Sequence, residues 1–212
     1  MTDSLTIQTA ENKKQSITYG LYLGVIALVL GIITMYISKS TSSLIVLYGV
    51  SAVLNLVIFI GITVFFSINL RKGYGGYWSF SQALKSIFIM LAFATLISSV
   101  GSFLFTKYVE PTIQEEVMNN TSSLTIEMME KAGADDEQID EVIAKLDEAK
   151  ASISNISFVQ FFKGFGITLI SYFVLALILA AIFKRERPIF LQGTNDSNNT
   201  YGNQSDSQIP NQ

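Results

Sequence analysis

Residues 69–85, NLRKGYGGYWSFSQALK, bring adjacent cations, three glycines and several aromatic rings into one short stretch. Glycines beside cations are typical of loops that bind phosphate, because backbone N–H groups can converge on the anion. The spacing matches neither the P-loop pattern G-x-x-x-x-G-K-S/T nor the dinucleotide pattern G-x-G-x-x-G. Because the stretch also separates two long apolar runs, the sequence favours the hinge of a membrane hairpin over a phosphate site.

A second set of residues that could do chemistry is the acidic cluster at 135–141. Carboxylates can bind Ca²⁺, but the EF-hand pattern requires oxygen ligands at alternating positions and a glycine at the sixth, which this stretch lacks. Acids are ordinary in the first turn of a helix, where the helix dipole favours negative charge. We therefore interpret the cluster as a helix start. It consists of Asp135, Asp136, Glu137, Asp140 and Glu141.

The chain has 212 residues and contains neither histidine nor cysteine. Disulfides, thiolate catalysis and cysteine metal sites are therefore excluded, and the commonest general base and metal ligand is missing. An enzyme built from this chain would need a carboxylate site, and its acids lack obvious partners. We expect no enzymatic activity, no catalytic or cofactor-binding residue, no metal and no nucleic-acid partner.

Four long apolar runs determine the expected fold class. Half of the residues are hydrophobic and 15% are charged, and a helix needs about 20 apolar residues to cross a bilayer. No run carries a charge near its centre, where each Lys, Arg or Asp costs about 3 kcal/mol. No signal-peptide cleavage pattern follows the first run, so we expect it to stay in place. The sequence predicts an all-α, four-helix transmembrane bundle with spans at about 17–38, 44–70, 84–106 and 158–183.

The distribution of cations predicts the orientation of the bundle. With four spans, the amino-terminal segment 1–16, the second connection and the carboxyl end share one side, which holds eight cations in short segments, all three arginines among them. The other side holds six lysines, four of them in one long loop. Cytoplasmic loops carry an excess of Lys and Arg, so we expect an inner (plasma) membrane protein with both termini in the cytoplasm. The polar residues 189–212 predict a disordered cytoplasmic tail.

The long extracytoplasmic loop, 107–157, holds twelve acids and four lysines, a net charge of −8. We expect a helix after Pro111, an interruption at NNTSS by poor helix formers, and a short helix ended by Gly133. An amphipathic helix follows from Asp135, whose apolar stripe either covers the mouth of the bundle or docks a periplasmic protein. The stripe consists of Ile139, Val142, Ile143, Leu146 and Ile153.

Each hinge residue has an expected role. The cations face anionic lipid headgroups, the glycines permit a tight reversal with positive φ, and the aromatic rings lie at the membrane interface. Ser79 and Gln82 have the spacing of a capping box, in which side chain and backbone bond reciprocally at a helix start. The expected hinge and interface anchors are Arg71, Lys72, Gly75, Gly76, Trp78, Ser79 and Gln82.

Inside the membrane the candidate polar residues are neutral. Asn55 is the most costly to leave facing lipid, and we expect it to hydrogen-bond a neighbouring helix, a contribution of about 1 kcal/mol; a substrate-binding role is the alternative. Small residues four apart permit close helix contacts within the bundle or in a homo-oligomer. The expected packing residues are Gly20, Gly24 and Gly31 in the first span, Ala94, Ser98 and Ser102 in the third, and Ala176 and Ala180 in the fourth. The richness of the third span in small residues places it at the centre of the bundle.

The pattern S-F-x-Q-x-x-K occurs at Ser79–Lys85 and again at Ser157–Lys163, each time where a span opens. An inverted repeat, as in many transporters, and the reuse of a favourable helix start are the two explanations. The similarity ends with the motif, which favours reuse.

Three stretches carry a resemblance to a known family: YGLYLGVIALVLGI in the first span, GGYWSFSQALK before the third and AAIFKRERP after the fourth. Together they resemble the bacterial family known as domain of unknown function 4199, over roughly residues 17–188. The resemblance implies a small four-span membrane protein, mostly of Gram-negative bacteria. It implies no established activity and no catalytic residues.

Two functions follow as hypotheses. The first is a non-enzymatic interaction or accessory protein that presents the acidic helical loop outside the cytoplasm. The second is a small oligomeric transporter or channel with a polar path past Asn55 and Ser98. A continuous polar cavity lined by these residues would favour transport, whereas dry helix contacts would favour the accessory role.

Overall fold

The computed structural model describes residues 2–154 and 158–186, with side chains placed at 10–151 and 161–186. Within these residues four helices are long and apolar enough to cross a membrane, and the expected all-α bundle is confirmed. The expectation of a disordered tail at 189–212 lies outside the described residues.

The four long helices follow the expected spans with shifted ends. They are α1 (Thr2–Ser40); a continuous helix made of α2 (Leu44–Ala52), η1 (Val53–Ile58) and α3 (Phe59–Gly73); a second continuous helix made of α4 (Phe80–Leu104) and η2 (Phe105–Val109); and α7 (Phe158–Phe183).

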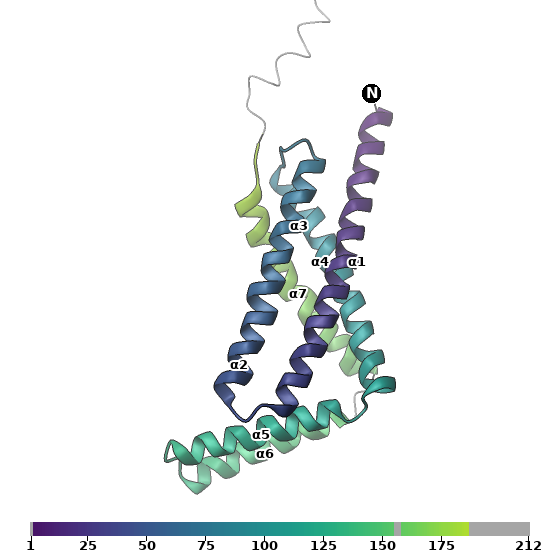
Figure 1. Ribbon diagram of the computed structural model, residues 1–212. Helices are drawn as coiled ribbons and strands as arrows, with labels where there is room; N and C mark the ends of the chain where they lie inside the picture. The colour runs from purple at the N-terminus through teal and green to yellow at the C-terminus, as the bar shows by residue number, and fades with distance from the viewer. Residues whose placement is uncertain (1, 155–157, 187–212) are drawn as a thin grey trace, which may run out of the picture.

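The amino-terminal turns of α1 continue beyond the apolar run. Its 39 residues correspond to about 58 Å at 1.5 Å each, against a hydrocarbon thickness of about 30 Å. Figure 1 shows this end of α1 at the same end of the bundle as the α3–α4 connection and the end of α7. Asn12 and Ser16 are buried there, so these turns pack against the protein.

The helix α4 lies at the centre of the bundle, as its small residues predict. It contacts α1, α3 and α7. The core gathers around it, with Leu23 from α1, Ile87 and Met90 from α4, and Ala176 and Ala180 from α7 all fully buried. The spans carry large exposed apolar side chains on their other faces, as helices in contact with lipid do.

The helices α5 (Ile113–Lys131) and α6 (Asp136–Ser154) form a hairpin that lies across the opposite end of the bundle (Figure 1). The contacts of α5 with the spans are to α1 and α2, and α6 packs on α5. Between them Gly133 adopts a φ of +77°. At the start of α6 the Gln138 backbone N–H donates to Asp135 Oδ1 at 2.8 Å.

The expected interruption of the helix at NNTSS, residues 119–123, is wrong, because α5 runs through it unbroken. The Asn120 side chain donates to the carbonyl oxygens of Ser38 and Thr41, both at 2.8 Å, and Ser122 is buried. Contacts with the end of α1 therefore outweigh the poor helix propensity of these residues, as tertiary packing commonly does.

Two π-helical segments, η1 and η2, interrupt the long helices and were not predicted. Such segments are rare in proteins overall, but those that do occur are often found at functional sites. The first contains Asn55 and the second contains Lys107. The apolar pattern runs on through both, so the sequence offers no signal for them.

The two copies of S-F-x-Q-x-x-K each lie at the start of a long helix. The helix α4 begins at Phe80 and α7 begins at Phe158, the phenylalanine of each motif. The two helices start at opposite ends of the bundle (Figure 1). Ser157, the first residue of the second copy, lies outside the described residues.

Candidate functional site

The hinge between α3 and α4 combines two left-handed glycines with a helix cap. Gly75 and Gly76 have φ values of 74° and 82°, a region that other L-residues rarely adopt. The Gln82 backbone N–H donates to Ser79 Oγ at 3.3 Å, and the Ser79 backbone N–H donates to Gln82 Oε1 at 3.1 Å. The hinge thus starts α4 with both hydrogen bonds of a capping box.

Backbone hydrogen bonds join the hinge to the chain just after α7. The Trp78 N–H donates to the Arg185 carbonyl at 2.7 Å, and the Arg185 N–H donates to the Trp78 carbonyl at 2.8 Å. Within the hinge, the Arg71 carbonyl accepts the N–H groups of Tyr74 and Gly76, both at 3.1 Å. Lys72 is exposed, and its Nζ lies 3.4 Å from Asn69 Oδ1.

The sequence predicts an interface anchor at Trp78, but the structure buries this residue. Its side chain is fully buried in the core cluster, and its ring centroid lies 5.6 Å from that of Tyr74. The paired backbone bonds to Arg185 hold Trp78 against the end of α7, where the neighbouring helices cover it. The indole Nε1 has no hydrogen-bond partner among the described residues.

The glycines of α1 allow a close approach to α4. A Cβ on Gly20 would lie 2.6 Å from the Met90 carbonyl oxygen, and one on Gly24 would lie 2.8 Å from Ile97 Cβ. Ala94, Ala176 and Ala180 are buried in the same core. Small residues at these positions therefore set the spacing of α1, α4 and α7.

Three of the expected packing residues have a different environment. A Cβ on Gly31 would meet no described atom within 4 Å. In the preceding turn of α1, Leu28 instead packs closely against Gly101 of α4. Ser98 and Ser102 line a cleft, so they are not part of a tightly packed face. Gly31 follows Gly24 by one heptad, and Ala94, Ser98 and Ser102 are four residues apart. Such spacings place the residues on one helix face but do not show which of them a neighbouring helix covers.

A cleft of about 310 Å³ lies among the four long helices, within the span region. Asn55 Nδ2 donates to Thr34 Oγ1 of α1 at 3.2 Å and to the Ser51 carbonyl at 3.0 Å. The Tyr172 ring stacks on Phe59 at 5.6 Å between centroids. The cleft is lined by Ala27, Leu30, Asn55, Phe59, Ser98, Ser99, Ser102 and Tyr172.

This cleft keeps free hydrogen-bonding capacity. The hydroxyls of Ser99 and Ser102 have no hydrogen-bond partner among the described residues. Asn55 uses its Nδ2 as a donor, and no described group donates to its Oδ1. Ser98 Oγ donates to the Thr95 carbonyl at 3.2 Å. Asn55 thus makes the expected contact with a neighbouring helix and also lines a polar cleft with Ser98. All the lining residues are neutral, so the cleft can offer hydrogen bonds but no ionic contact.

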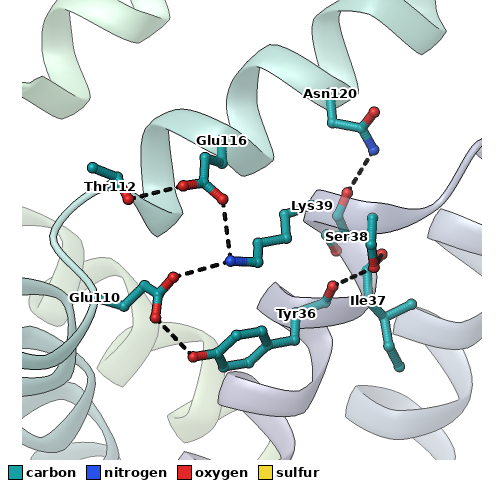
Figure 2. Close-up of polar contacts among 9 residues, drawn as sticks. Tyr36, Ile37, Ser38, Lys39, Glu110, Thr112, Glu116 and Asn120 are labelled. Atoms are coloured by element: carbon teal, nitrogen blue, oxygen red, sulfur yellow. Dashed lines mark hydrogen bonds and ion pairs between the residues drawn. The ribbon is translucent and has the colours of Figure 1, made fainter.

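A charged clamp, defined as Tyr36, Lys39, Glu110 and Glu116, fixes the hairpin to the end of α1 (Figure 2). Lys39 Nζ lies 3.0 Å from Glu110 Oε1 and 3.1 Å from Glu116 Oε2. Tyr36 donates its hydroxyl to Glu110 Oε2 at 2.9 Å. Sequence reasoning missed this clamp, because Lys39 and Glu110 are 71 residues apart and no local pattern links them.

The clamp lowers the pKa values of both glutamates. The hydrogen bond from Lys39, then that from Tyr36, holds the pKa of Glu110 below its ordinary value of 4.5. The Thr112 hydroxyl, which donates to Glu116 Oε1 at 2.8 Å, and then Lys39 lower the pKa of Glu116. Both carboxylates are therefore ionised at neutral pH and hold Lys39 between them.

The apolar stripe of α6 is its least exposed face. Ile139, Val142, Ile143 and Leu146 are half-buried, while the acids beside them are exposed. Since α6 packs on α5, this stripe faces α5. Ile153 lies where side chains are not described. In the described part of the chain, no group of three or more His, Cys, Asp or Glu residues is placed to hold a metal ion.

Comparison with known proteins gives a match to a family model over most of the chain. The family described as "Protein of unknown function (DUF4199)" matches residues 18–185. No curated protein and no solved structure matches the chain. Because the match covers most of the 212 residues and includes the four long helices, the chain belongs to the DUF4199 family of proteins of unknown function.

Proposed function

We propose that this multi-pass membrane protein is a non-enzymatic accessory component of the inner membrane that presents its acidic hairpin outside the cytoplasm. The observation that carries the proposal is the clamp. Glu116 of the hairpin and Glu110, which lies just before it, share Lys39. Asn120 of the hairpin bonds two carbonyls at the end of α1. A loop held in this way keeps one orientation relative to the bundle, which suits the presentation of a binding surface.

The charge distribution supports the orientation. The end of the bundle that carries the hinge also carries the exposed cations Lys13, Lys14, Lys72 and Arg185. An excess of Lys and Arg marks the cytoplasmic side. The hairpin, with its net charge of −8 over residues 107–157, then faces the periplasm.

The partner surface that we propose is on α6. This surface has two parts, the solvent-exposed edge of the apolar stripe and the exposed acids beside it, such as Asp140. The stripe consists of Ile139, Val142, Ile143 and Leu146. A periplasmic protein with a basic, partly apolar surface would fit this combination, because complementary charge steers association and fixes its register.

A photo-crosslinking amino acid tests this proposal in intact cells. Placed at Asp140 it should yield one discrete crosslinked protein, and placed at Val25, an exposed apolar position on α1, it should not. Adding Glu137→Lys and Glu141→Lys should remove the product. The absence of any discrete product at Asp140, or the same product from both positions, would contradict the proposal.

A second candidate function, a small oligomeric transporter or channel, is favoured by the polar cleft at Asn55. Its neutral lining suits an uncharged polar solute. Purified protein in liposomes would then speed glycerol uptake over empty liposomes, measured by stopped-flow light scattering, and Asn55→Leu would abolish the gain. Uptake equal to that of empty liposomes would remove this candidate.

A further inference from the structure

A second and larger cavity lies between the third long helix and the hairpin. Its volume is about 650 Å³, and its walls come from the ends of α4 and η2, the start of α5 and the end of α6. This volume is within the range of about 300–1,000 Å³ that is usual for ligand pockets. The lining residues are Phe103, Thr106, Lys107, Pro111, Gln114, Glu115, Met118, Asn119, Lys150 and Ala151.

Two lysines from separate elements supply positive charge to this cavity. Lys107 lies in η2 and Lys150 in α6. Lys107 Nζ lies 5.6 Å from the ring centre of Phe103 and 5.5 Å from that of Tyr108, and none of the described carboxylates lies within 4.0 Å of it. Lys150 Nζ lies 3.8 Å from Asp147 Oδ1, a long ion pair. Glu115 is the one acid in the lining.

The depth of the cavity places it at the lipid headgroups. The third long helix ends at Val109, so Lys107 lies at the edge of the apolar span. The lining combines Phe103 from the end of α4 with the polar residues Gln114 and Asn119 of α5. A site of this kind meets the hydrocarbon on one side and water on the other.

We propose that this cavity binds the phosphate headgroup of an anionic phospholipid. The ammonium groups of Lys107 and Lys150 pair with the phosphate, Gln114 and Asn119 donate hydrogen bonds, and the apolar wall takes the glycerol and the first acyl carbons. Basic pockets between membrane helices bind anionic headgroups on the cytoplasmic side of membranes, and Lys107 and Lys150 offer the same charge pairing at the opposite end of this bundle. The bound lipid also joins η2 to the hairpin and so offsets repulsion between the acidic hairpin and an anionic membrane.

Binding of phosphatidylglycerol to the full-length protein in neutral detergent, followed by native mass spectrometry, tests the proposal. The test variant is Lys107→Gln/Lys150→Gln. The matched control is Lys131→Gln/Lys145→Gln, which removes the same charge from two exposed hairpin lysines outside the cavity. We expect the test variant to bind about 25-fold more weakly, about fivefold for each lysine near an anionic lipid, and the control to bind like the wild type. Phosphatidylcholine should bind weakly to all three.

Three outcomes would overturn the inference. An equal loss of phosphatidylglycerol affinity in the test and control variants would mean that binding depends on the net charge of the hairpin and not on the cavity lysines. Equal binding of phosphatidylcholine and phosphatidylglycerol would mean that the lysines recognise no anion. Displacement of phosphatidylglycerol by millimolar inorganic phosphate would mean that the site takes free phosphate. Circular dichroism of each variant verifies that it is folded, so a loss of binding reports on the cavity.

Discussion

At the scale of single residues, the environment of a glycine depends on the helix that faces it. A Cβ on Gly20 would meet the Met90 carbonyl at 2.6 Å, whereas one on Gly31 would meet nothing described within 4 Å. We predict that Gly20→Ala destabilises the bundle by about 1–3 kcal/mol through overpacking. Gly31→Ala should be neutral or stabilising, because alanine is the better helix former by about 1 kcal/mol. Thermal unfolding in detergent measures both; equal effects would contradict the α1–α4 contact.

Trp78 offers a direct optical test, because it is the one tryptophan in the chain. Its burial predicts emission typical of an apolar site and little quenching by acrylamide or by brominated lipid, because neither reaches the ring. The control is a Trp78→Phe/Tyr108→Trp variant, since Tyr108 is 70% exposed at the other end of the span. Strong quenching of Trp78 by brominated lipid would instead place it at the membrane interface.

The clamp has a pH dependence whose sign follows from the glutamates. The pKa values of both glutamates are lowered in the folded state. Their contribution to the stability of the folded state is therefore fully present at pH values above the ordinary pKa of 4.5, and it is lost as the pH falls through the lowered pKa values. No histidine is present to titrate near neutrality. We predict one narrow distance between spin labels at Tyr48 and Met128 from pH 8 to 6 and a broad distribution below about pH 4. A distribution that stays narrow at pH 3 would contradict the role of the clamp.

At the scale of elements, α5 depends on contacts that are distant in sequence. Lys39 bonds two glutamates beside α5, whereas Lys131 pairs with Glu127 one turn away on the exposed surface, a kind of pair that contributes little. We predict that Lys39→Ala speeds amide hydrogen exchange across the first half of α5 and that Lys131→Ala leaves it unchanged. The same exchange rates in both variants would mean that α5 is held by other contacts.

The sequence was most informative where the signal is local. The spans follow from apolar length, and the cap at Ser79 and Gln82 and the positive φ of Gly75 and Gly76 follow from short spacing. The sequence was misleading where the answer depends on a distant partner: Asn120 keeps α5 helical by bonding the end of α1, and Arg185 holds Trp78 in the core. The cavities at Asn55 and Lys107 could not be predicted from the sequence, because residues from several helices line each of them.

At the scale of the whole molecule, the two ends of the bundle differ in charge and in construction. One end carries the hinge, the long amino-terminal turns of α1 and most of the exposed cations; the other carries the acidic hairpin (Figure 1). We propose that this asymmetry fixes the protein in the membrane, with the hairpin outside the cytoplasm and the hinge inside.

Single cysteines measure this directly, because the chain has none of its own. Glu148→Cys is exposed on the hairpin and Lys72→Cys is exposed at the hinge. After permeabilisation of the outer membrane alone, a membrane-impermeant maleimide should label the hairpin cysteine and leave the hinge cysteine unlabelled until the inner membrane is disrupted. Labelling of the hinge cysteine first, or of both at once with the inner membrane intact, would contradict the account.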